Sequence, residues 1–335
     1  MRNTFLLLFS SSVLFSCSDE PITQQDIIPT SVGLHGEVVV VMTQTEKDGR
    51  PGESIIEFLE APYQRLPQYE PMFKVVFQQA ETYEKFYQKH HSVITVDIRD
   101  HIDYQDRGRI KVSRDQEALG QVRYVMGAKN WEDFGILCEE RGEELANLIQ
   151  DEQRKRVRKQ LKRYHSKELQ KVLRDTADLK IDMIKGLFLA ESRDNFTWLR
   201  KGRSKNNPEL QQEYYIYRTP YNSDQAFSLE NLIQLRDSVL KEHVKANVTD
   251  GEMSTETRFE VVLDTINHNG EFATLMKGLW KIPAKFMGGP FISLSFLDKE
   301  SKNIITIEGN VYAPHDKKRE FMREIEAIVR TAKEL

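Results

Sequence analysis

Residues 291–311 read FISLSFLDKESKNIITIEGNV, two apolar runs on either side of a short charged loop. The runs 291–297 and 303–311 are rich in β-branched and aromatic residues, which strands favour. The loop 298–302 contains only polar residues. A short polar loop between two such runs predicts an antiparallel hairpin, so the sheet in this part of the chain is expected to be largely antiparallel.

Further strand-like segments lie at residues 179–190, 196–201, 214–217, 258–266 and 271–280. Segments 227–244 and 317–332 place apolar residues along one side of a helix. Strands in succession with helices packed on them predict an α+β arrangement for residues 176–335. The order of these segments also resembles the PsbP-like sandwich, a resemblance in order alone that carries no function with it.

Residues 37–175 alternate strand-like and helix-like segments instead. Strands are expected at 37–42, 73–77, 92–98, 109–112 and 121–126, and helices at 53–59 and 82–89. This alternation predicts a sheet with helices packed on it. The chain is therefore expected to be an α+β protein with two α/β subdomains, residues 37–175 and 176–335.

Residues 131–175 have a helical pattern and a divided charge. Residues 132–152 carry eight acids and one base, whereas residues 154–174 carry ten bases and one acid. One straight helix over this segment would be about 68 Å long, so we expect two helices with a break near Tyr164-His165-Ser166. The basic half is interpreted as a solvated face, with an anionic envelope surface as the alternative.

A short apolar segment, residues 5–14, follows Arg2 at the start of the chain. It is too short to span a bilayer and has the layout of a secretory signal. The segment leads into Leu14-Phe15-Ser16-Cys17, the residue order of a lipobox. We therefore expect a signal peptide over residues 1–16 and a lipid on Cys17.

Residues 17–36 are mostly polar and predict a flexible tether of about 60 Å when extended. Ser18-Asp19-Glu20 behind the cysteine resembles the surface-export signal of Bacteroidota-type lipoproteins. The expected location is the cell envelope, with the N-terminal lipid in a membrane. The outer membrane is favoured, and the surface and the periplasm remain alternatives for the side that the protein faces.

Several chemistries have no support in the sequence. The formal charge of −4 provides no overall field for nucleic acid, so no nucleic-acid partner is expected. Cys138 has no partner once Cys17 is acylated, and it is interpreted as a small buried hydrophobe. The chain contains no GxSxG, P-loop, GxGxxG, HExxH or CxxC motif, and we expect neither metal nor cofactor. The loop 97–103 is interpreted as solvated, and His90-His91, if helical, would point apart.

Six short motifs follow one another in the second half of the chain. They are Pro220-Tyr221, Arg236-Asp237-Ser238, Gly278-Leu279-Trp280, Met287-Gly288-Gly289-Pro290-Phe291, Tyr312-Ala313-Pro314 and Lys318-Arg319. Through them the chain resembles, over nearly all of its mature length, the lipoprotein family catalogued as domain of unknown function 4837. Met276-Lys277 stand where the family pattern leads us to expect an acid and an arginine. The resemblance implies a surface-sorted or periplasm-facing lipoprotein and supplies no activity, ligand or catalytic residue.

No residue is assigned a catalytic role. The candidate binding residues are the polar, glycine and aromatic members of these motifs: Arg236, Asp237, Trp280, Gly288, Gly289, Phe291, Tyr312 and Arg319. Gly288-Gly289 are expected to form a tight bend, and Asp237 to pair with Lys241 four residues later on a helix. Trp280 and Phe291, with Phe286, are expected either to line a groove for sugar or peptide or to belong to the core.

Two functions remain open. The first is a non-catalytic binding or accessory module of the cell envelope, with a protein or a glycan as partner. The second is a hydrolase of an envelope polymer that uses carboxylates on or beside strands: Asp182, Glu191, Glu260, Asp264 and Glu308. A deep pocket with two carboxylates about 5 to 9.5 Å apart would favour the hydrolase, and a flat aromatic patch, or no pocket, the binding module. The oligomeric state stays undetermined.

Overall fold

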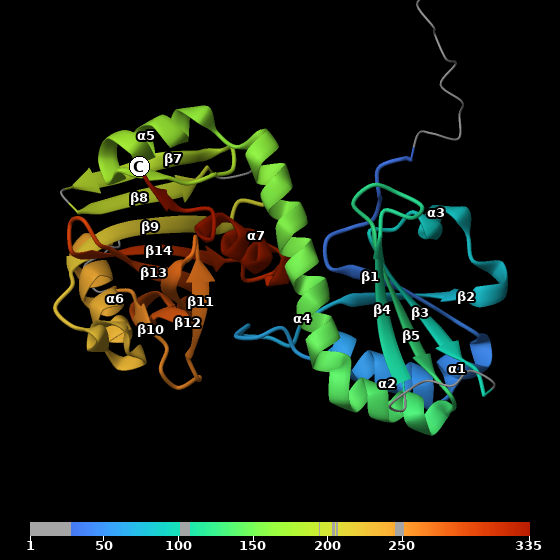
Figure 1. Cartoon of the computed structure of the whole chain (residues 1–335). Helices are drawn as coiled ribbons and strands as arrows, with labels where there is room; N and C mark the ends of the chain where they lie inside the picture. Colours follow the sequence, from blue (N-terminus) through green and yellow to red (C-terminus); the bar gives the residue numbers. More distant parts are fainter. Residues whose placement is uncertain (1–27, 101–107, 194, 203–204, 206, 245–250) are drawn as a thin grey trace, which may run out of the picture.

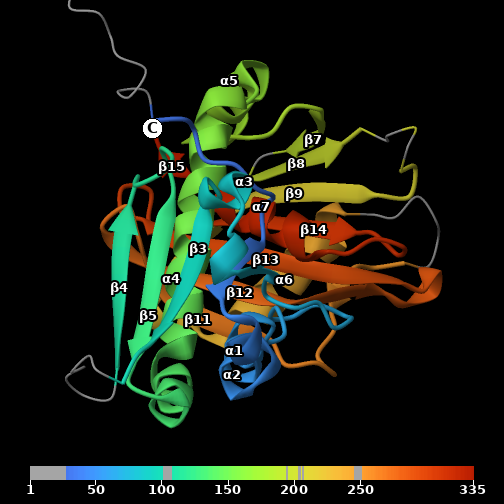
Figure 2. The same cartoon turned by 90° about the vertical axis from the view of Figure 1, so that its right-hand side faces the viewer.

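The computed structural model describes residues 28–100, 108–193, 195–202, 205, 207–244 and 251–335. The predicted signal peptide, Cys17 and residues 101–103 of the acidic loop lie outside this part of the chain. Two sheets lie side by side, and the long helix α4 (Trp131–Tyr164) runs between them (Figure 1). In the view turned by 90°, the N-terminal sheet stands in front of the C-terminal one (Figure 2). The predicted α+β class is confirmed.

The N-terminal sheet contains the strands that the apolar runs of residues 37–126 predict. Its order is β2-β1-β3-β5-β4, and only the edge strand β4 is antiparallel to its neighbour. The strands are β1 (Glu37–Met42), β2 (Lys74–Gln79), β3 (Ser92–Ile98), β4 (Gly108–Arg114) and β5 (Val122–Ala128). Residues 38–42 are buried throughout, as expected for a central parallel strand covered on both faces.

Helices cover both faces of this sheet. On one face pack α2 (Arg50–Leu59), beside the short α1 (Gln44–Asp48), and the first half of α4. Cys138 belongs to this core, and burial raises the pKa of its thiol to about 12, in keeping with an inert apolar role.

The other face carries η2 (Ala80–Thr82) and α3 (Lys85–Gln88). The single helix expected at 82–89 is wrong, because the extended backbone of Glu84 separates these two turns.

The C-terminal sheet is antiparallel in every pair that the structure describes. Its order is β10-β12-β13-β14-β9-β8-β7, and β11 pairs with β12. The predicted hairpin is confirmed, since β13 and β14 pair from Asp298 with Asn303 to Phe291 with Asn310. The strands are β7 (Leu187–Arg193), β8 (Phe196–Lys201), β9 (Gln211–Pro220), β10 (Ser254–Thr255), β11 (Val262–His268), β12 (Glu271–Ile282), β13 (Met287–Asp298) and β14 (Asn303–Tyr312).

The strand expected at 179–190 is divided in two. β6 (Leu179–Lys180) pairs with β15 (Lys333–Glu334) in a separate sheet, and only β7 joins the large one. Gly186 before β7 has a φ of +86°, a left-handed conformation that favours glycine and turns the chain.

Helices also cover both faces of the C-terminal sheet. α5 (Lys167–Ala177), α7 (Arg319–Val329) and the second half of α4 lie on one face, and α6 (Leu229–His243) lies on the other (Figure 1). Two short turns, η4 (Asp224–Phe227) and η5 (Pro283–Lys285), complete this part. Residues 304–310 of β14 are all buried because the strand is covered on both sides.

The predicted break in the charged helical region is confirmed. α4 ends at Tyr164 and α5 begins at Lys167, where the Ser166 hydroxyl accepts a hydrogen bond from Leu169 N at 3.3 Å and caps the helix. Ile149 of α4 packs in the N-terminal core and Leu161 in the C-terminal core. At 34 residues α4 is about 51 Å long, and it therefore contributes to both cores.

The chain is already held by hydrogen bonds before Gly36. Leu119 N donates to Pro29 O at 2.7 Å, and Ser31 N donates to Leu119 O at 2.9 Å. Val32 N donates to Lys89 O at 3.0 Å. The tether expected over residues 17–36 therefore ends no later than Pro29, because the residues after it pack along the N-terminal sheet.

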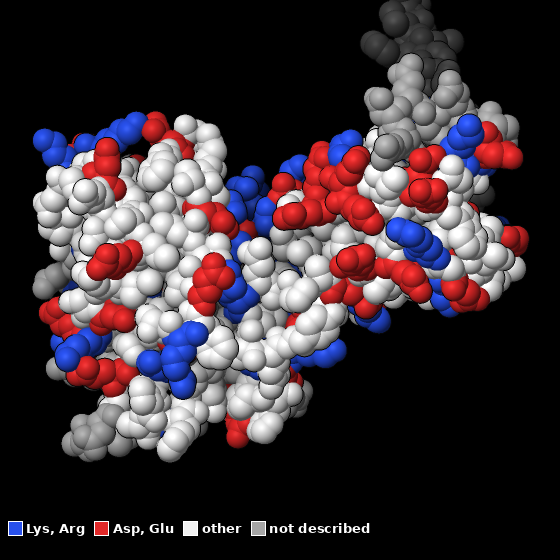
Figure 3. Space-filling model, turned by 90° about the horizontal axis from the view of Figure 1, so that it is seen from below, with Lys and Arg blue, Asp and Glu red and all other residues white. Residues whose placement is uncertain are grey.

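Charge is unevenly distributed over the molecule. In the view from below, acidic side chains gather over the N-terminal unit, where α2 and the first half of α4 lie (Figure 3). The exposed acids of these helices include Glu53, Glu57, Glu139 and Glu140. The basic half of α4 runs to the opposite, upper end (Figure 1). Among the described helices, none is both long enough and apolar enough to cross a membrane.

Candidate functional site

A cavity of about 570 Å³ opens on the face of the C-terminal sheet that carries α6. Strands β7, β8, β9, β12, β13 and β14 line it, together with the end of α6 at Glu242 and His243. These strands are far apart in the sequence but follow closely in the order of the sheet. The cavity exists because antiparallel pairing brings their ends together beside one helix.

Three side-chain N–H groups at this cavity have no hydrogen-bond acceptor. They are the indole nitrogens of Trp198 and Trp280 and Nδ2 of Asn310, and all three residues line the cavity. Trp280 is 3% exposed and Asn310 is 2% exposed. A buried donor without an acceptor costs roughly 1–3 kcal/mol, so folded proteins retain few of them. Because these nitrogen atoms are themselves buried, a ligand that brings acceptor oxygens reaches them once the side chains around the cavity shift.

Aromatic rings surround these donors. The ring centroids of Trp280 and Tyr312 lie 6.3 Å apart, and those of Trp198 and Tyr215 lie 5.9 Å apart. Phe286 is 98% exposed at a φ of +52°, and the residues on either side of it line the cavity. Phe286 therefore points away from the core, which corrects the expectation that it might pack with Trp280 and Phe291.

On one side of the cavity, Arg200 pairs with Glu213 and lies over the indole ring of Trp198. Arg200 lies 5.1 Å from the ring centroid of Trp198, and its Nε lies 2.8 Å from Glu213 Oε1. The other carboxylate oxygen of Glu213 accepts a hydrogen bond from the Tyr215 hydroxyl at 2.5 Å. Burial raises the pKa of Glu213, although Tyr215 and Arg200 act in the opposite direction. Both oxygens of Glu213 are thus occupied by the protein itself.

Gly289 allows the indole of Trp280 to sit at the cavity. The two residues are paired across β12 and β13. A Cβ atom at Gly289 would lie 2.0 Å from Val311 O and 3.2 Å from Trp280 Nε1. Gly288 and Gly289 lie within β13, so the tight bend expected of them is wrong; the glycines are needed because neighbouring backbone approaches closely.

Arg236 and Phe291 lie beneath the site and not in it. Arg236 and Glu308 are both fully buried, with Arg236 Nε and Nη2 each 2.8 Å from an oxygen of Glu308. The guanidinium carbon of Arg236 lies 4.0 Å from the ring centroid of Phe291. Burial alone would lower the pKa of Arg236, but the charge and hydrogen bonds of Glu308 raise it. These residues hold α6 against β14 and β13.

The predicted pair between Asp237 and Lys241 is wrong. Asp237 Oδ1 accepts hydrogen bonds from Thr255 N at 2.8 Å and from the Thr255 hydroxyl at 2.7 Å. Lys241 instead pairs with Glu252 at 3.0 Å. Asp237 therefore ties α6 to β10, because a tertiary partner replaces the local one.

Arg319 lies away from the cavity, at the contact between the two sheets. The carboxylate of Glu70, which is 4% exposed, accepts hydrogen bonds from Lys318 N at 2.6 Å and Arg319 N at 3.0 Å. Arg319 Nη1 donates to Pro71 O at 2.6 Å. A carboxylate from the loop before β2 thus caps the N-terminus of α7, where no side chain of the helix does so. The structure places Arg319 in this contact and not with Trp280.

The strand-borne acids of the hydrolase hypothesis do not gather in one place. Of the five, only Glu191 lines the cavity, where it pairs with Arg193 at 2.8 Å. The partners of the others are Gln170 for Asp182, Arg65 for Glu260, Lys277 for Asp264 and Arg236 for Glu308. Each acid is held by a different neighbour.

Sequence reasoning missed Trp198, Arg200, Glu213 and Asn310. One signal was available, since Asn310 lies within the largely apolar strand β14, where it faces Glu213 at the polar start of β9. A polar residue in the middle of an apolar strand is informative because its burial needs a partner. Which residues would surround it depended on the strand order, which the sequence did not specify.

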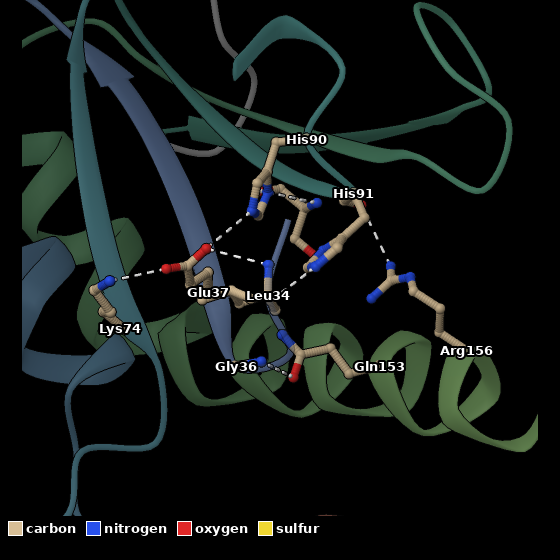
Figure 4. A network of polar contacts seen from close by, with 9 residues as sticks. Leu34, Gly36, Glu37, Lys74, His90, His91, Gln153 and Arg156 are labelled. Atoms are coloured by element: carbon tan, nitrogen blue, oxygen red, sulfur yellow. Dashed lines mark hydrogen bonds and ion pairs between the residues drawn. The ribbon is translucent and has the colours of Figure 1, made fainter. Parts of the chain in front are cut away.

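A second polar cluster joins the N-terminal segment to α4 (Figure 4). The rings of His90 and His91 lie 4.3 Å apart, so the expectation that they point apart is wrong; α3 has ended at Gln88. His91 Nε2 lies 2.9 Å from Leu34 O, and His90 Nε2 lies 3.8 Å from Glu37 Oε2. Within the described ranges, no three His, Cys, Asp or Glu side chains are grouped as a metal site would need.

Acidification from pH 7 to pH 5 is expected to lower the free energy of unfolding by about 2 kcal/mol through His91. Burial and then the charge of Arg156 lower the pKa of His91 from 6.5 to about 2. The unfolded chain takes up this proton below about pH 6.5, whereas the folded chain does not, so stability falls as the pH drops. Urea unfolding at both pH values should show a loss about 2 kcal/mol smaller in His91→Gln; an equal loss would contradict the prediction.

Comparison with known proteins yields two family matches. Residues 166–331 match the model described as Domain of unknown function (DUF4837), and residues 31–162 match Domain of unknown function (DUF8532). The expected resemblance is confirmed for the segment that contains all six motifs, whereas the N-terminal half matches the second family. No curated protein matches the chain.

Two solved structures show a distant likeness. A mutant of the protein Mog1 has 10% identity and a TM-score of 0.30, covering 47% of this chain and 90% of its own. The human StarD13 (DLC2) lipid transfer and protein localization domain has 13% identity and a TM-score of 0.24, covering 49% and 98%. At such TM-scores neither likeness supports an argument about fold or function.

Proposed function

Because residues 166–331 of this chain form a DUF4837 domain, a domain of unknown function, we propose its role from its own cavity: a non-catalytic module that binds a glycan. The module is displayed on the cell envelope by a lipid on Cys17. The observation that carries the proposal is the set of three buried N–H donors without acceptors, those of Trp198, Trp280 and Asn310.

A sugar matches the chemistry of the cavity. The C–H faces of a sugar ring pack on aromatic rings, and its hydroxyl and carbonyl oxygens accept hydrogen bonds. The rings of Trp198 and Tyr312 supply the first contact. The two indole N–H groups and the amide of Asn310 supply the second. The exposed residue Phe286 stands between two residues that line the cavity, Lys285 and Met287.

The charges around the cavity favour a neutral ligand. Three basic residues line it, Arg193, Arg200 and Lys285. Three acidic residues line it as well, Glu191, Glu213 and Glu242. Two of these acids pair with two of these bases within the protein. A polyanion would meet as many repelling groups as attracting ones, whereas hydroxyl groups can bond to both kinds.

Replacing Trp198 with alanine is expected to weaken oligosaccharide binding about tenfold or more, because one stacking face and one N–H donor are lost. Asn310→Leu, which keeps the volume and removes the amide, should weaken binding to a similar degree. The measurement is calorimetric titration of the mature chain, made soluble by Cys17→Ala, with chitotriose, maltotriose and cellotriose.

Trp131→Ala is the matched control for this experiment. Trp131 is 40% exposed at the start of α4 and does not line the cavity, so its removal should leave the affinity unchanged. If none of the three sugars binds, or if Trp198→Ala and Trp131→Ala bind equally well, the glycan proposal fails. Release of shorter sugars during the titration would favour the hydrolase instead.

A further inference from the structure

A second cavity, of about 370 Å³, opens where α4 ends and α5 begins. Basic side chains from three parts of the chain line it: Arg158, Lys162 and His165 at the end of α4, Lys180 in β6 and Lys333 in β15. The pairing of β6 with β15 brings the last two together, Lys180 directly opposite Lys333. This basic pocket lies on the face of the C-terminal unit opposite α6.

The positive charge of the basic pocket is only partly neutralised by the protein, through Asp182. Within the part of the chain that the structure describes, no carboxylate lies within 4.0 Å of Arg158, Lys162, Lys180 or Lys333. The one acid of the pocket, Asp182, is buried and accepts a hydrogen bond from Gln170 Nε2 at 3.0 Å. Like charges gathered in this way repel one another unless an anion joins them.

The positive charge of the pocket also lowers the pKa of His268, which lies nearby. Its pKa is lowered first by burial and then by the charges of Arg330, Arg158 and Lys333. Arg330 is itself paired with Glu326, whereas the other two have no acidic partner. The charges of Arg158 and Lys333 therefore act on the same place in the structure, although the two residues are far apart in the sequence.

A helix N-terminus faces the same region. α5 begins at Lys167, between His165 and Gln170, which both line the pocket. The positive end of an 11-residue helix favours an anion there. Two carbonyls near the end of α4, Leu161 O and Lys162 O, accept hydrogen bonds from His165.

The pocket and the start of the described chain lie toward the same end of the molecule. In both cartoon views α5 and the first described residues are at the top (Figures 1 and 2). The acidic side chains of α2 and early α4 lie at the bottom (Figure 3). From Cys17 to residue 28 the chain can extend about 36 Å. An anionic surface that holds Cys17 could therefore reach the basic end, which lies toward the start of the described chain.

We propose that the basic pocket binds a phosphate group. Arg158 offers a planar pair of donors to phosphate oxygens, and the lysines act as point charges around them. The phosphate can come from the headgroup of an anionic lipid or from a soluble phosphate ester. This site is separate from the aromatic cavity, so its test does not depend on the glycan proposal.

The test compares two charge-matched double variants of the soluble full chain carrying Cys17→Ala. The pocket variant is Lys162→Gln with Lys333→Gln. The control is Lys159→Gln with Lys171→Gln, exposed lysines of the same helical region that do not line the pocket. Binding is measured to phosphatidylcholine vesicles with and without phosphatidylglycerol, and to glycerol phosphate in solution. The pocket variant is expected to bind about tenfold more weakly, and the control within about twofold of the parent chain.

The outcomes separate the two phosphate sources. Loss of binding to both vesicles and glycerol phosphate means that the pocket recognises a phosphate from either source. Loss confined to the vesicles identifies a lipid headgroup as the ligand. If the parent chain binds neither probe, or if both variants lose the same affinity, the pocket has no phosphate site and the proposal is overturned.

Discussion

Replacing Glu308 with leucine is expected to lower the free energy of unfolding by about 3–5 kcal/mol. The change leaves the guanidinium of Arg236 fully buried without the carboxylate that it contacts through two hydrogen bonds of 2.8 Å. The remaining partners of Arg236 are a weaker contact with Asp237 at 3.2 Å and the Thr255 hydroxyl at 3.0 Å. The guanidinium then has no access to water, and only the partly exposed carboxylate of Asp237 is left to balance its charge.

A double variant distinguishes an unpaired charge from a simple packing defect. Arg236→Met together with Glu308→Leu removes both charges and keeps apolar volume, and it should regain most of the loss. Urea unfolding followed by the fluorescence of Trp198 and Trp280 reports on this sheet. Should the double variant be as unstable as Glu308→Leu alone, packing and not charge would be the cause.

The same pair also affects the aromatic cavity. Glu308 and Asn310 are two residues apart in β14, so their side chains lie on the same face of the sheet. Glu308 holds α6 through Arg236, and the end of α6 lines the cavity at His243. Any loosening of this ion pair therefore moves a wall of the proposed sugar site, although neither charged group touches the ligand.

The second large effect is expected at Glu326, where replacement by glutamine should cost about 3 kcal/mol. Its carboxylate, 2% exposed, lies 3.2 Å from Arg154 Nη1, 3.0 Å from Arg330 Nε and 3.9 Å from Lys277 Nζ. These cations come from α4, from the residue that follows α7 and from β12, so one buried carboxylate of α7 joins three elements. The value is at the low end for a buried pair because the three cations keep some contact with water.

The pH dependence of this effect has a defined sign. Burial alone would raise the pKa of Glu326, but Lys277, Arg154 and Arg330 lower it below 4.5. Its stabilising contribution is therefore complete above about pH 4.5 and is lost as the pH falls through the lowered pKa. The difference between the parent chain and Glu326→Gln should be largest near pH 7 and shrink in acid.

Glu324→Gln is the control for this prediction. Glu324 lies on the same helix, and its hydrogen-bond partner is the neutral amide of Gln212 at 3.0 Å. Its replacement should cost less than about 1 kcal/mol. A similar cost for both variants, or a Glu326→Gln effect that does not shrink in acid, would contradict the assigned network.

Lys277 departs from the family pattern, and its tertiary contacts explain the departure. An arginine is expected at this position from the motif order, and here a lysine reaches both Asp264 at 3.5 Å and Glu326 at 3.9 Å. The side chain at position 277 therefore pairs with the buried carboxylate of Glu326. Lysine still reaches this carboxylate, although its side chain is shorter than that of arginine. Its role in this chain is structural.

Local patterns predicted most of the elements correctly. The hairpin of β13 and β14, the break between α4 and α5, and the amphipathic helices α6 and α7 follow from side-chain periodicity and short loops, which act between residues close in sequence. The predictions were wrong where a contact with a residue distant in the sequence replaced the expected local contact. Glu70 caps α7 and accepts a hydrogen bond from Arg319 N, and Asp237 accepts a hydrogen bond from the Thr255 hydroxyl. Neither Arg319 nor Asp237 therefore has the role that was expected from the residues near it in the sequence.

The sequence by itself determined the α+β class, the antiparallel hairpin and the divided charge of α4, because each depends on neighbours along the chain. It also contains the lipobox order that predicts a lipid on Cys17. Only the tertiary structure decided which side chains form the two cavities. Trp198, Trp280 and Asn310 meet because β8, β12 and β14 take particular places in one sheet. Lys180 and Lys333 meet because the chain end pairs with β6, and such long-range pairing is not encoded in any short stretch of residues.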